Sequence, residues 1–272
     1  MKIAVSNIAW QLAEEEATAQ ILQAFEIKGV EIATTKLWHS PLAATNSDIE
    51  DYKHFWRSRN IEIIAMQALL FGRPDLTIFD NTQTRQETFK YLVDTIELGS
   101  KLGAKFLVFG SPKNRKIGDL TWQQVEEIAV DFFQKIGESA AKWGIKFCIE
   151  PNPQAYECDF ITNSQQGLEL VNKVNSDGFG LHLDTASMTL SNESIQPALE
   201  QSFSKLCHFH ISEPLLAPIE KGNVNHLIFA DTLANLNYQG WASIEMKAQH
   251  PISNSLNVSK ALEFATKYYG CK

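Results

Sequence analysis

Four side chains that could bind a metal ion each stand at or near the end of a short apolar stretch in the second half of the sequence. Glu150 ends IKFCIE, Asp184 lies near the end of FGLHLDT, His210 near the end of LCHFHI, and Glu245 near the end of WASIEM. Each stretch is typical of a buried strand, and the Pro-Asn-Pro after Glu150 stops regular structure there. If these strand ends meet, two glutamates, an aspartate and a histidine form a divalent-metal site.

A metal site of this composition supports proton transfer on a hydroxy-carbonyl compound. Moving a proton between adjacent carbons passes through an enediolate, and a metal ion that chelates the carbonyl oxygen and its neighbouring hydroxyl stabilises the negative charge. Oxygen ligands with one imidazole suit Mg, Mn, Co or Zn and argue against Cu(I) or an iron–sulfur centre. One of the two glutamates, Glu150 or Glu245, could remove the proton from one face of the substrate while the other returns it.

Each of these residues also has a purely structural interpretation. A glutamate at a strand end can cap the next helix or pair with a lysine. Asp184-Thr185 can be a plain turn, and a lone histidine such as His210 can be a hydrogen-bonded core residue. The joint pattern favours the metal site, because the structural interpretation needs four independent coincidences at four successive strand ends.

Length and charge set limits on the class of protein. The chain has 272 residues, 44% of them hydrophobic and 21% charged, and a net charge of -8. An acidic chain disfavours nucleic acid as a partner, since nucleic-acid-binding proteins usually carry a basic stripe. The first residues, MKIAVS, enter a strand directly without the apolar core of a signal peptide. No apolar run reaches the ~18 residues of a membrane span, so we expect no membrane partner.

The cysteines indicate the compartment. Cys148, Cys158, Cys207 and Cys271 show no CxxC pairing, and two of them lie inside predicted strands. This pattern is typical of reduced thiols, because disulfides persist mainly in oxidising compartments. We therefore expect a cytoplasmic protein.

Apolar runs and helical repeats alternate along the whole chain. The predicted strands are Lys2–Asn7, Gly29–Ala33, Ile61–Ala68, Ala104–Phe109 and the four stretches above. The predicted helices are Glu14–Ile27, Asp48–Arg59, Thr84–Leu102, Trp122–Trp143, one ending near Val174, Ser194–Phe203, Leu227–Leu236 and Ser255–Tyr268. Thr121 with Gln124, and Thr162 with Gln165, have the spacing of a capping box at a helix start.

Eight strand–helix units without a linker between them predict one α/β domain over residues 1–272, built on a parallel sheet. Units of this length favour a closed (β/α)₈ TIM barrel over an open doubly wound sheet. The open alternative would have a glycine-rich turn after the first strand, where the chain has Asn7-Ile-Ala-Trp10. Functional groups in such barrels gather at the C-terminal rim, which is where the four candidate ligands fall.

The residues at these strand ends resemble those of a known group. The motifs are Ile149-Glu-Pro-Asn152, His182-Leu-Asp-Thr185, His208-Phe-His-Ile-Ser-Glu213 and Ser243-Ile-Glu-Met246. On these motifs the whole chain resembles the xylose-isomerase-like TIM-barrel superfamily, and within it the sugar (or sugar-phosphate) isomerase/epimerase branch. The resemblance implies that Glu150, Asp184, His210 and Glu245 bind one divalent ion such as Mn, Mg, Co or Zn. It also implies that Glu150 and Glu245 are the acid/base pair, and that the partner is a small-molecule carbohydrate.

Two positions depart from the ketose 3-epimerases of this superfamily. Those enzymes commonly have a histidine three residues after the aspartate ligand, where this chain has Ser187. They also carry an arginine after the HxxE-like stretch, where Leu215, Leu216 and Ala217 stand. We therefore expect the broader activity, an isomerase or epimerase of a sugar, a sugar phosphate or a related polyol.

Further candidates for substrate contact lie near the same rim. Strand alternation puts His182 and His208 on the inward side beneath the metal ligands, where they could also be hydrogen-bonded core residues. Lys247 shares the face of Glu245 and could neutralise a substrate phosphate or carboxylate, or form a salt bridge at the rim. Ser187 takes the position of a substrate-facing histidine.

Loop residues supply the remaining candidates. Glu157 could touch substrate hydroxyls or face solvent. Trp10, with Trp38 and Phe71, could form an apolar wall beside a sugar or pack under a helix. The segment Lys113-Asn-Arg115 offers phosphate-binding charge or a solvated loop.

Three other functions stay open. A polyol dehydratase of the inosose type shares the first step, because enolisation can be followed by loss of a β-hydroxyl. A metal-dependent phosphodiesterase of the apurinic-endonuclease kind needs extra ligands, for which the first four strand ends offer only Glu31 and the nearby His39. A non-catalytic metal- or sugar-binding barrel would keep the site without turnover. The sequence does not choose the sugar, its phosphorylation or the metal, and it is compatible with a homo-oligomer.

Overall fold

Eight parallel strands pair in sequence order and close into a barrel, because β1 pairs with both β2 and β8. The computed structural model describes residues 1–219, 222–249 and 253–270. The strands are β1 (Lys2–Ser6), β2 (Gly29–Ala33), β3 (Glu62–Gln67), β4 (Phe106–Phe109), β5 (Lys146–Ile149), β6 (Phe179–Asp184), β7 (Leu206–Ser212) and β8 (Trp241–Glu245). The predicted closed (β/α)₈ barrel is confirmed, and the open sheet is wrong.

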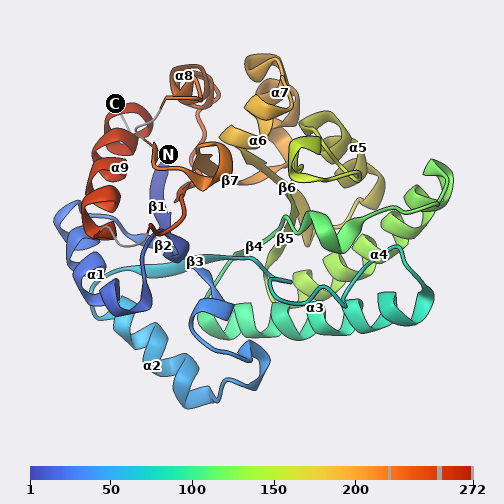
Figure 1. Cartoon of the computed structure of the whole chain (residues 1–272), viewed down its shortest axis with the longest axis horizontal. Helices are drawn as coiled ribbons and strands as arrows, with labels where there is room; N and C mark the ends of the chain where they lie inside the picture. Colours follow the sequence, from blue (N-terminus) through green and yellow to red (C-terminus); the bar gives the residue numbers. More distant parts are fainter. Residues whose placement is uncertain (220–221, 250–252, 271–272) are drawn as a thin grey trace.

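The helices alternate with the strands and surround them (Figure 1). They are α1 (Glu15–Ala24), α2 (Asn46–Arg57), α3 (Thr82–Leu102), α4 (Trp122–Lys142), α5 (Ser164–Val174), α6 (Thr185–Leu190), α7 (Ile195–Ser202), α8 (His226–Asn235) and α9 (Asn254–Tyr269). Short 3₁₀ turns that matter for the site are η1 (Asn7–Ala9), η3 (Thr34–Lys36), η5 (Pro112–Arg115), η6 (Gln154–Tyr156) and η8 (Pro214–Leu216). Helix α9 contacts α1 and β1, so the last helix returns to the beginning of the chain.

Capping side chains set the starts of the long helices. The capping box predicted at Thr121 is confirmed at the start of α4. The box predicted for Thr162 with Gln165 is wrong by one residue. Asn163 is the N-cap of α5, and its Oδ1 accepts a hydrogen bond from the amide of Gln166 at 2.9 Å. Asparagine is among the most favourable N-cap residues, so the helix starts there.

A shift of register in the sheet helps to align the rim. In the pairing of β6 with β7, Cys207 is an extra residue of β7 without a partner. Gly180 on β6 makes room for it, since a Cβ there would lie 2.3 Å from the Cys207 sulfur. Beyond the shift, Asp184 stands opposite His210. A second shift, between β2 and β3, lies directly before Glu31. Bulges are common next to active sites because they re-aim side chains.

Aromatic side chains fill the space between α4 and strands β4 to β6. Phe133 of α4 is fully buried, and its ring centroid lies 5.8 Å from that of Phe109 and 5.0 Å from that of Phe179. Burying one such side chain contributes roughly 1.5–3 kcal/mol. Phe147 of β5 belongs to the same cluster, so this packing holds the strand that ends at Glu150.

None of the helices in the described ranges is long and apolar enough to cross a membrane. Cys148, Cys158 and Cys207 are free thiols, and the first two are buried. Cys271 lies outside the described residues.

Gly178 allows α4 to approach the start of β6 closely. A Cβ at this position would lie 1.9 Å from the carbonyl oxygen of Gly137 and 2.6 Å from the amide nitrogen of Ala141. The backbone of a packed helix has little freedom to move away. We therefore expect Gly178→Ala to lower the free energy of unfolding by about 2–3 kcal/mol, the upper part of the range for overpacking. Urea unfolding followed by circular dichroism measures the change.

Gly99→Ala in α3 is the matched control. A Cβ at Gly99 would lie 2.9 Å from a side-chain carbon of Leu107, which can move. The substitution also gains about 1 kcal/mol of helix propensity. Its free energy of unfolding should therefore stay close to that of the unmodified protein. Equal losses in the two variants would contradict the argument.

Candidate metal centre and active-site pocket

The four candidate ligands meet at one rim of the barrel. Glu150 directly follows β5, Asp184 ends β6, His210 lies in β7 and Glu245 ends β8. Ligand atoms of Glu150, Asp184 and His210 all lie within 4.8 Å of one another. Glu245 joins them through His210, whose Nδ1 is 3.3 Å from Glu245 Oε2. The structure therefore brings together the four residues that the sequence pattern singled out.

Glu150 is held by the backbone around it and by a buried arginine. Nη2 of Arg115 donates to the Glu150 carbonyl oxygen and to Oδ1 of Asn152, both at 2.7 Å. The Glu150 amide donates to the carbonyl oxygen of Phe109 at 3.1 Å. Gly110 leaves room for the carboxylate, since a Cβ there would lie 2.3 Å from Glu150 Oε2. The carboxylate thus has a fixed place between the ends of β4 and β5.

Two hydrogen bonds orient the carboxylate of Asp184. Its Oδ1 accepts from the amide of Ser187 at 2.6 Å, and its Oδ2 accepts from the hydroxyl of Ser212. Asp184 is thereby the N-cap of the short helix α6, which the sequence pattern does not predict. Aspartate is a strong N-cap, so the same residue starts the helix and faces the rim. Each carboxylate oxygen keeps a further lone pair for a metal ion.

A buried carboxylate, Glu31 on β2, supports His210 from the other side. Glu31 Oε2 lies 2.9 Å from Nε2 of His210 and 3.3 Å from Nε2 of His208, and the side chain is fully buried. A carboxylate only accepts hydrogen bonds, so we assign a proton to Nε2 of His210. Nδ1, which faces Glu245, is then available as a ligand. Metal-binding histidines commonly donate their second N–H to a carboxylate in this way.

The charges beneath the rim follow from burial and from these contacts. Burial alone would raise the pKa of Glu31, but the charges of His210 and His208 hold it well below its usual range. Burial alone would lower the pKa of His210, but Glu31 and Glu245 raise it well above its usual value. Burial lowers the pKa of His208 and of His182. Beneath the rim, Glu31 and His210 thus favour each other's charged form, while burial disfavours a charge on His182.

His182 is a buried imidazole without a hydrogen-bond partner on either ring nitrogen. Its Nε2 is 3.8 Å from Glu150 Oε1, and its ring centroid is 4.1 Å from that of His210. The ring of His208 stacks on Phe106, with centroids 5.4 Å apart. Both histidines face the barrel interior beneath the rim, as strand alternation predicts. Neither is among the described residues that line the pocket at the rim.

The donor set fits a divalent cation. Burial, and next the charge of Glu245, raise the pKa of both Glu150 and Asp184. A bound cation would remove this repulsion and favour the charged form of each carboxylate. The Nδ1 of His210 is buried without a hydrogen-bond partner and points to the same place. Three carboxylates and one imidazole suit Mg, Mn, Co or Zn.

A pocket of about 620 Å³ opens beside these residues, a size that suits a small ligand. Its wall includes Glu150 and Glu245 and three other sequence candidates, Trp10, Phe71 and Lys247. Much of the remaining wall is apolar, including Ile8, Ala33, Ala68, Val108, Leu216 and Ala248. The pocket therefore places an apolar surface next to the charged rim.

Three other candidates lie outside this wall. Ser187 is buried behind Asp184. Glu157 is exposed at the end of η6, with a positive φ of 61°. The ring of Trp38 packs 6.1 Å from that of Tyr52. None of the three is among the described residues that line the pocket.

Three residues at the site carry little sequence signal. Arg115 is fully buried, so both the phosphate-binding and the solvated-loop interpretation are wrong for it. Glu31 interrupts an apolar strand, and a charge inside such a strand is the signal that could have found it. Lys36 also lines the pocket, and only its position after a strand points to the rim.

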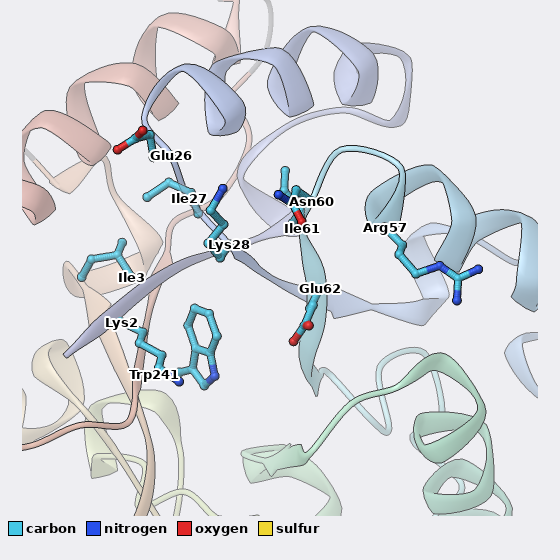
Figure 2. Close-up of a pocket in the computed structure, with 10 residues that line it drawn as sticks. All are labelled: Lys2, Ile3, Glu26, Ile27, Lys28, Arg57, Asn60, Ile61, Glu62 and Trp241. Carbon is cyan, nitrogen blue, oxygen red and sulfur yellow. The ribbon is translucent and has the colours of Figure 1, made fainter.

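A second pocket, of about 570 Å³, lies at the opposite end of the barrel (Figure 2). Lys2, Glu62 and Trp241, which begin three of the strands, line it. Nζ of Lys2 lies 5.4 Å from the centroid of the Trp241 ring. The N-terminal face of such barrels contributes to stability, while chemistry takes place at the C-terminal face. We therefore do not assign the candidate active site to this pocket.

Known proteins share this arrangement of strands and helices. The profile of the family described as "Xylose isomerase-like TIM barrel" matches residues 19–268. The chain belongs to this family. Within the xylose isomerase-like barrels, a probable ketose 3-epimerase from Synechocystis sp. is 25% identical over 259 residues, which cover 90% of this chain and 84% of the relative.

Solved structures show the same fold. The D-psicose 3-epimerase from Clostridium cellulolyticum H10, solved with D-tagatose, has a TM-score of 0.83, with 17% identity and complete coverage of both chains. The IOLI protein, solved with a bound zinc atom, has a TM-score of 0.78, with 17% identity, and the match covers 99% of this chain and 98% of that one. At this identity the likeness establishes the barrel fold alone.

Glu31→Gln keeps the size of the side chain and removes its charge. The orientation of His210 would then no longer be fixed by a carboxylate. We expect the affinity for Mn²⁺ to fall about 10- to 100-fold, the usual effect of losing the group behind a histidine ligand. Calorimetric titration of the metal-free protein with Mn²⁺ measures the change.

Glu213→Gln is the matched control for that experiment. Glu213 is also fully buried, and its Oε1 lies 3.2 Å from Nε2 of His226, which is not a candidate ligand. We expect this variant to keep its affinity for Mn²⁺. If both variants lost affinity equally, the loss of a buried charge would be responsible and not the contact of Glu31 with His210.

Proposed function

We propose that this chain is a divalent-metal-dependent isomerase or epimerase of a small carbohydrate, with residues 1–272 acting as one domain. The observation that carries the proposal is the meeting of Glu150, Asp184, His210 and Glu245 beside a pocket of about 620 Å³. The relatives support it, since one is named a probable ketose 3-epimerase and one similar structure holds a zinc atom.

In the proposed reaction, the two glutamates exchange a proton of the substrate. A bound divalent ion would stabilise the negative charge of an enediolate and acidify the C–H next to a chelated carbonyl. Glu150, after β5, and Glu245, at the end of β8, belong to strands three positions apart in the barrel, so they reach the reacting carbon from opposed directions. One removes the proton and the other returns it on the opposite face. Asp184 and His210 act as ligands, and Glu31 orients His210.

The other residues of the rim have separate roles. Lys247 lines the pocket and contacts the part of the substrate beyond the metal, while Trp10, in the same wall, is fully buried and packs against Trp56. The apolar wall keeps bulk water away from the proton in transit. Ser187 acts on the ligand Asp184 and not on the substrate. We assign no direct substrate contact to His182, His208 or Glu157, because they lie outside the pocket wall.

The phosphodiesterase alternative has less support. That chemistry needs further metal ligands at other strand ends. Within the described residues, the two groups that could hold a metal ion both include His210, so they do not form separate centres. His39, a possible extra ligand from the first half of the barrel, is exposed. One ion at the rim agrees better with enediolate chemistry.

Removal of the metal ion should abolish turnover. We expect dialysis against a chelator to reduce substrate deuterium exchange to background, and Mn²⁺, Co²⁺ or Mg²⁺ to restore it, because the enediolate charge would otherwise be unsupported. The measurement is a screen of ketoses, ketose phosphates and inosose in D₂O, with metal content verified by mass spectrometry. Undiminished exchange by protein verified as metal-free would contradict the proposal.

Glu150→Gln and Glu245→Gln nearly preserve side-chain size and keep one oxygen for the metal ion. We expect each variant to lower turnover by a factor on the order of 10²–10⁴, the usual contribution of general acid–base catalysis, while substrate still binds. NMR of solvent deuterium incorporation into the best substrate of the screen measures this.

Glu157→Gln serves as the comparison, because its exposed side chain lies outside the pocket wall, and it should keep the full rate. A wild-type rate in Glu150→Gln or Glu245→Gln would show that the glutamate is a ligand only. Tight binding of a sugar by the unmodified protein without any exchange would favour a non-catalytic barrel.

A further inference from the structure

Lys36, at the end of η3, places a cation in the wall of the same pocket as Glu150 and Glu245. Its side chain is half-buried. Nζ donates hydrogen bonds to the carbonyl oxygens of Asn7 and Trp10, and it lies 5.0 Å from the centroid of the Trp10 ring. An ammonium group has three N–H donors, so one remains for a further acceptor.

The surroundings of Lys36 do not supply that acceptor. The ion pairs of the described residues do not include Lys36. Glu15 and Glu14 are near enough to act on its charge, but three of their four carboxylate oxygens accept hydrogen bonds from other residues. Glu15 Oε1 accepts from the Tyr52 hydroxyl at 2.8 Å, and Glu14 Oε1 accepts from the Asn254 amide at 3.0 Å.

Lys36 is charged at neutral pH in spite of its partial burial. Burial lowers its pKa to about 8, and Glu15 and Glu14 act in the opposite direction. A partly buried cation that is bonded only to neutral carbonyl groups is stabilised when an anion binds beside it. The pocket wall is thus prepared for a negatively charged group at this point.

Lys247 brings a second cation to the same pocket. It is exposed and follows Glu245 by two residues. Its amide donates to the carbonyl oxygen of Leu216 at 2.9 Å, and the next amide, of Ala248, donates to the carbonyl oxygen of Ile8 at 2.8 Å. Lys36 is bonded to this same turn after β1. The backbone after β8 and the side chain of Lys36 therefore both contact η1, and neither lysine forms an ion pair among the residues that the structure describes.

We propose that Lys36 and Lys247 bind an oxyanion of the substrate, a carboxylate or a phosphate, so that the substrate is an acidic keto-sugar and not a neutral one. The proposal rests on the proposed function, since it assumes that the metal centre holds the other end of the substrate. It agrees with the two positions at which this chain departs from the ketose 3-epimerases. Leu216, in the region of their arginine, is an apolar part of the pocket wall, and Ser187, at the position of their histidine, is buried away from the pocket. Charge–charge contacts then supply the recognition at the far end of the substrate.

Calorimetry with three probes tests the proposal on the full chain loaded with Mn²⁺. The probes are D-fructose, D-fructose 6-phosphate and 5-keto-D-gluconate, each also titrated into Mn²⁺ buffer alone. We expect one acidic probe to bind about ten times more tightly than D-fructose or better, and this advantage to fall as salt is raised. Which acidic probe binds more tightly distinguishes a phosphate from a carboxylate.

Lysine variants assign the effect to residues. Lys36→Met and Lys247→Met should each weaken binding of the acidic probe about 10- to 100-fold, the usual effect of losing a charged hydrogen bond. Binding of D-fructose, which carries no oxyanion, should weaken much less than binding of the acidic probe. Lys247→Arg should keep the preference. Lys101→Met is the matched control, because Lys101 lies on α3 and pairs with Glu97.

Two results would overturn the proposal. Equal affinity for the three probes would rule out an oxyanion site in this pocket. Equal weakening of all three by Lys36→Met would show that Lys36 only ties η1 to η3. If Lys36→Met does not fold, Lys247→Met and the salt dependence decide.

Metal binding and proton exchange without a preference for acidic probes would leave the proposed function standing. Tight binding of an acidic probe without exchange of any substrate proton would defeat the proposed function instead.

Discussion

Repulsion among three carboxylates is the constraint on which the candidate site depends. Glu150, Asp184 and Glu245 gather where little water reaches them, and the pKa of the first two rises accordingly. Two like charges 4 Å apart repel by about 4 kcal/mol at an effective dielectric constant of 20. A typical protein is stable by only about 5–15 kcal/mol. Such a cluster therefore needs compensating positive charge, from the protein and from a bound cation.

The protein's own share of that charge is built into the fold. Arg115 is fully buried and acts on Glu150 as a nearby positive charge, while its Nη2 fixes the turn that follows β5. Glu31 accepts the Nε2 proton of His210 from below, which leaves Nδ1 for the cation. Arg115 therefore places a carboxylate and also lowers the cost of gathering the three, whereas Glu31 places an imidazole. The remaining charge matches one divalent ion.

The fold and the ligand set could be predicted from the sequence because both leave local patterns. Strands buried on two faces give continuous apolar runs, and a polar residue at the end of such a run is easy to recognise. Glu150 and Glu245 are of this kind. The register shift at Cys207 leaves no such pattern, because it depends on how β7 pairs with β6. The contact of Glu31 with His210 spans the barrel interior and is equally invisible in either strand alone.

The roles of Arg115 and Lys36 could not be predicted from the sequence for a different reason. Both side chains bond to backbone carbonyl oxygens, Lys36 to those of Asn7 and Trp10, and Arg115 to that of Glu150 besides Oδ1 of Asn152. Every residue type offers a backbone acceptor, so these contacts do not require a partner of a particular type in the sequence. A basic residue in a loop is then read as solvated by default. Only the folded backbone shows that these two cations lie inside the molecule.

The position of Glu31 makes the two halves of the barrel chemically unequal. Strands β5 to β8 present all four proposed ligands, whereas the carboxylate behind His210 comes from β2. A half-barrel fragment made of the last four units would carry the complete ligand set, but Nε2 of His210 would lack its carboxylate acceptor, Glu31. Grafting the four ligands onto another barrel would fail in the same way unless the acidic residue of the second strand went with them. Closure of the barrel is thus a condition for the chemistry as well as for stability.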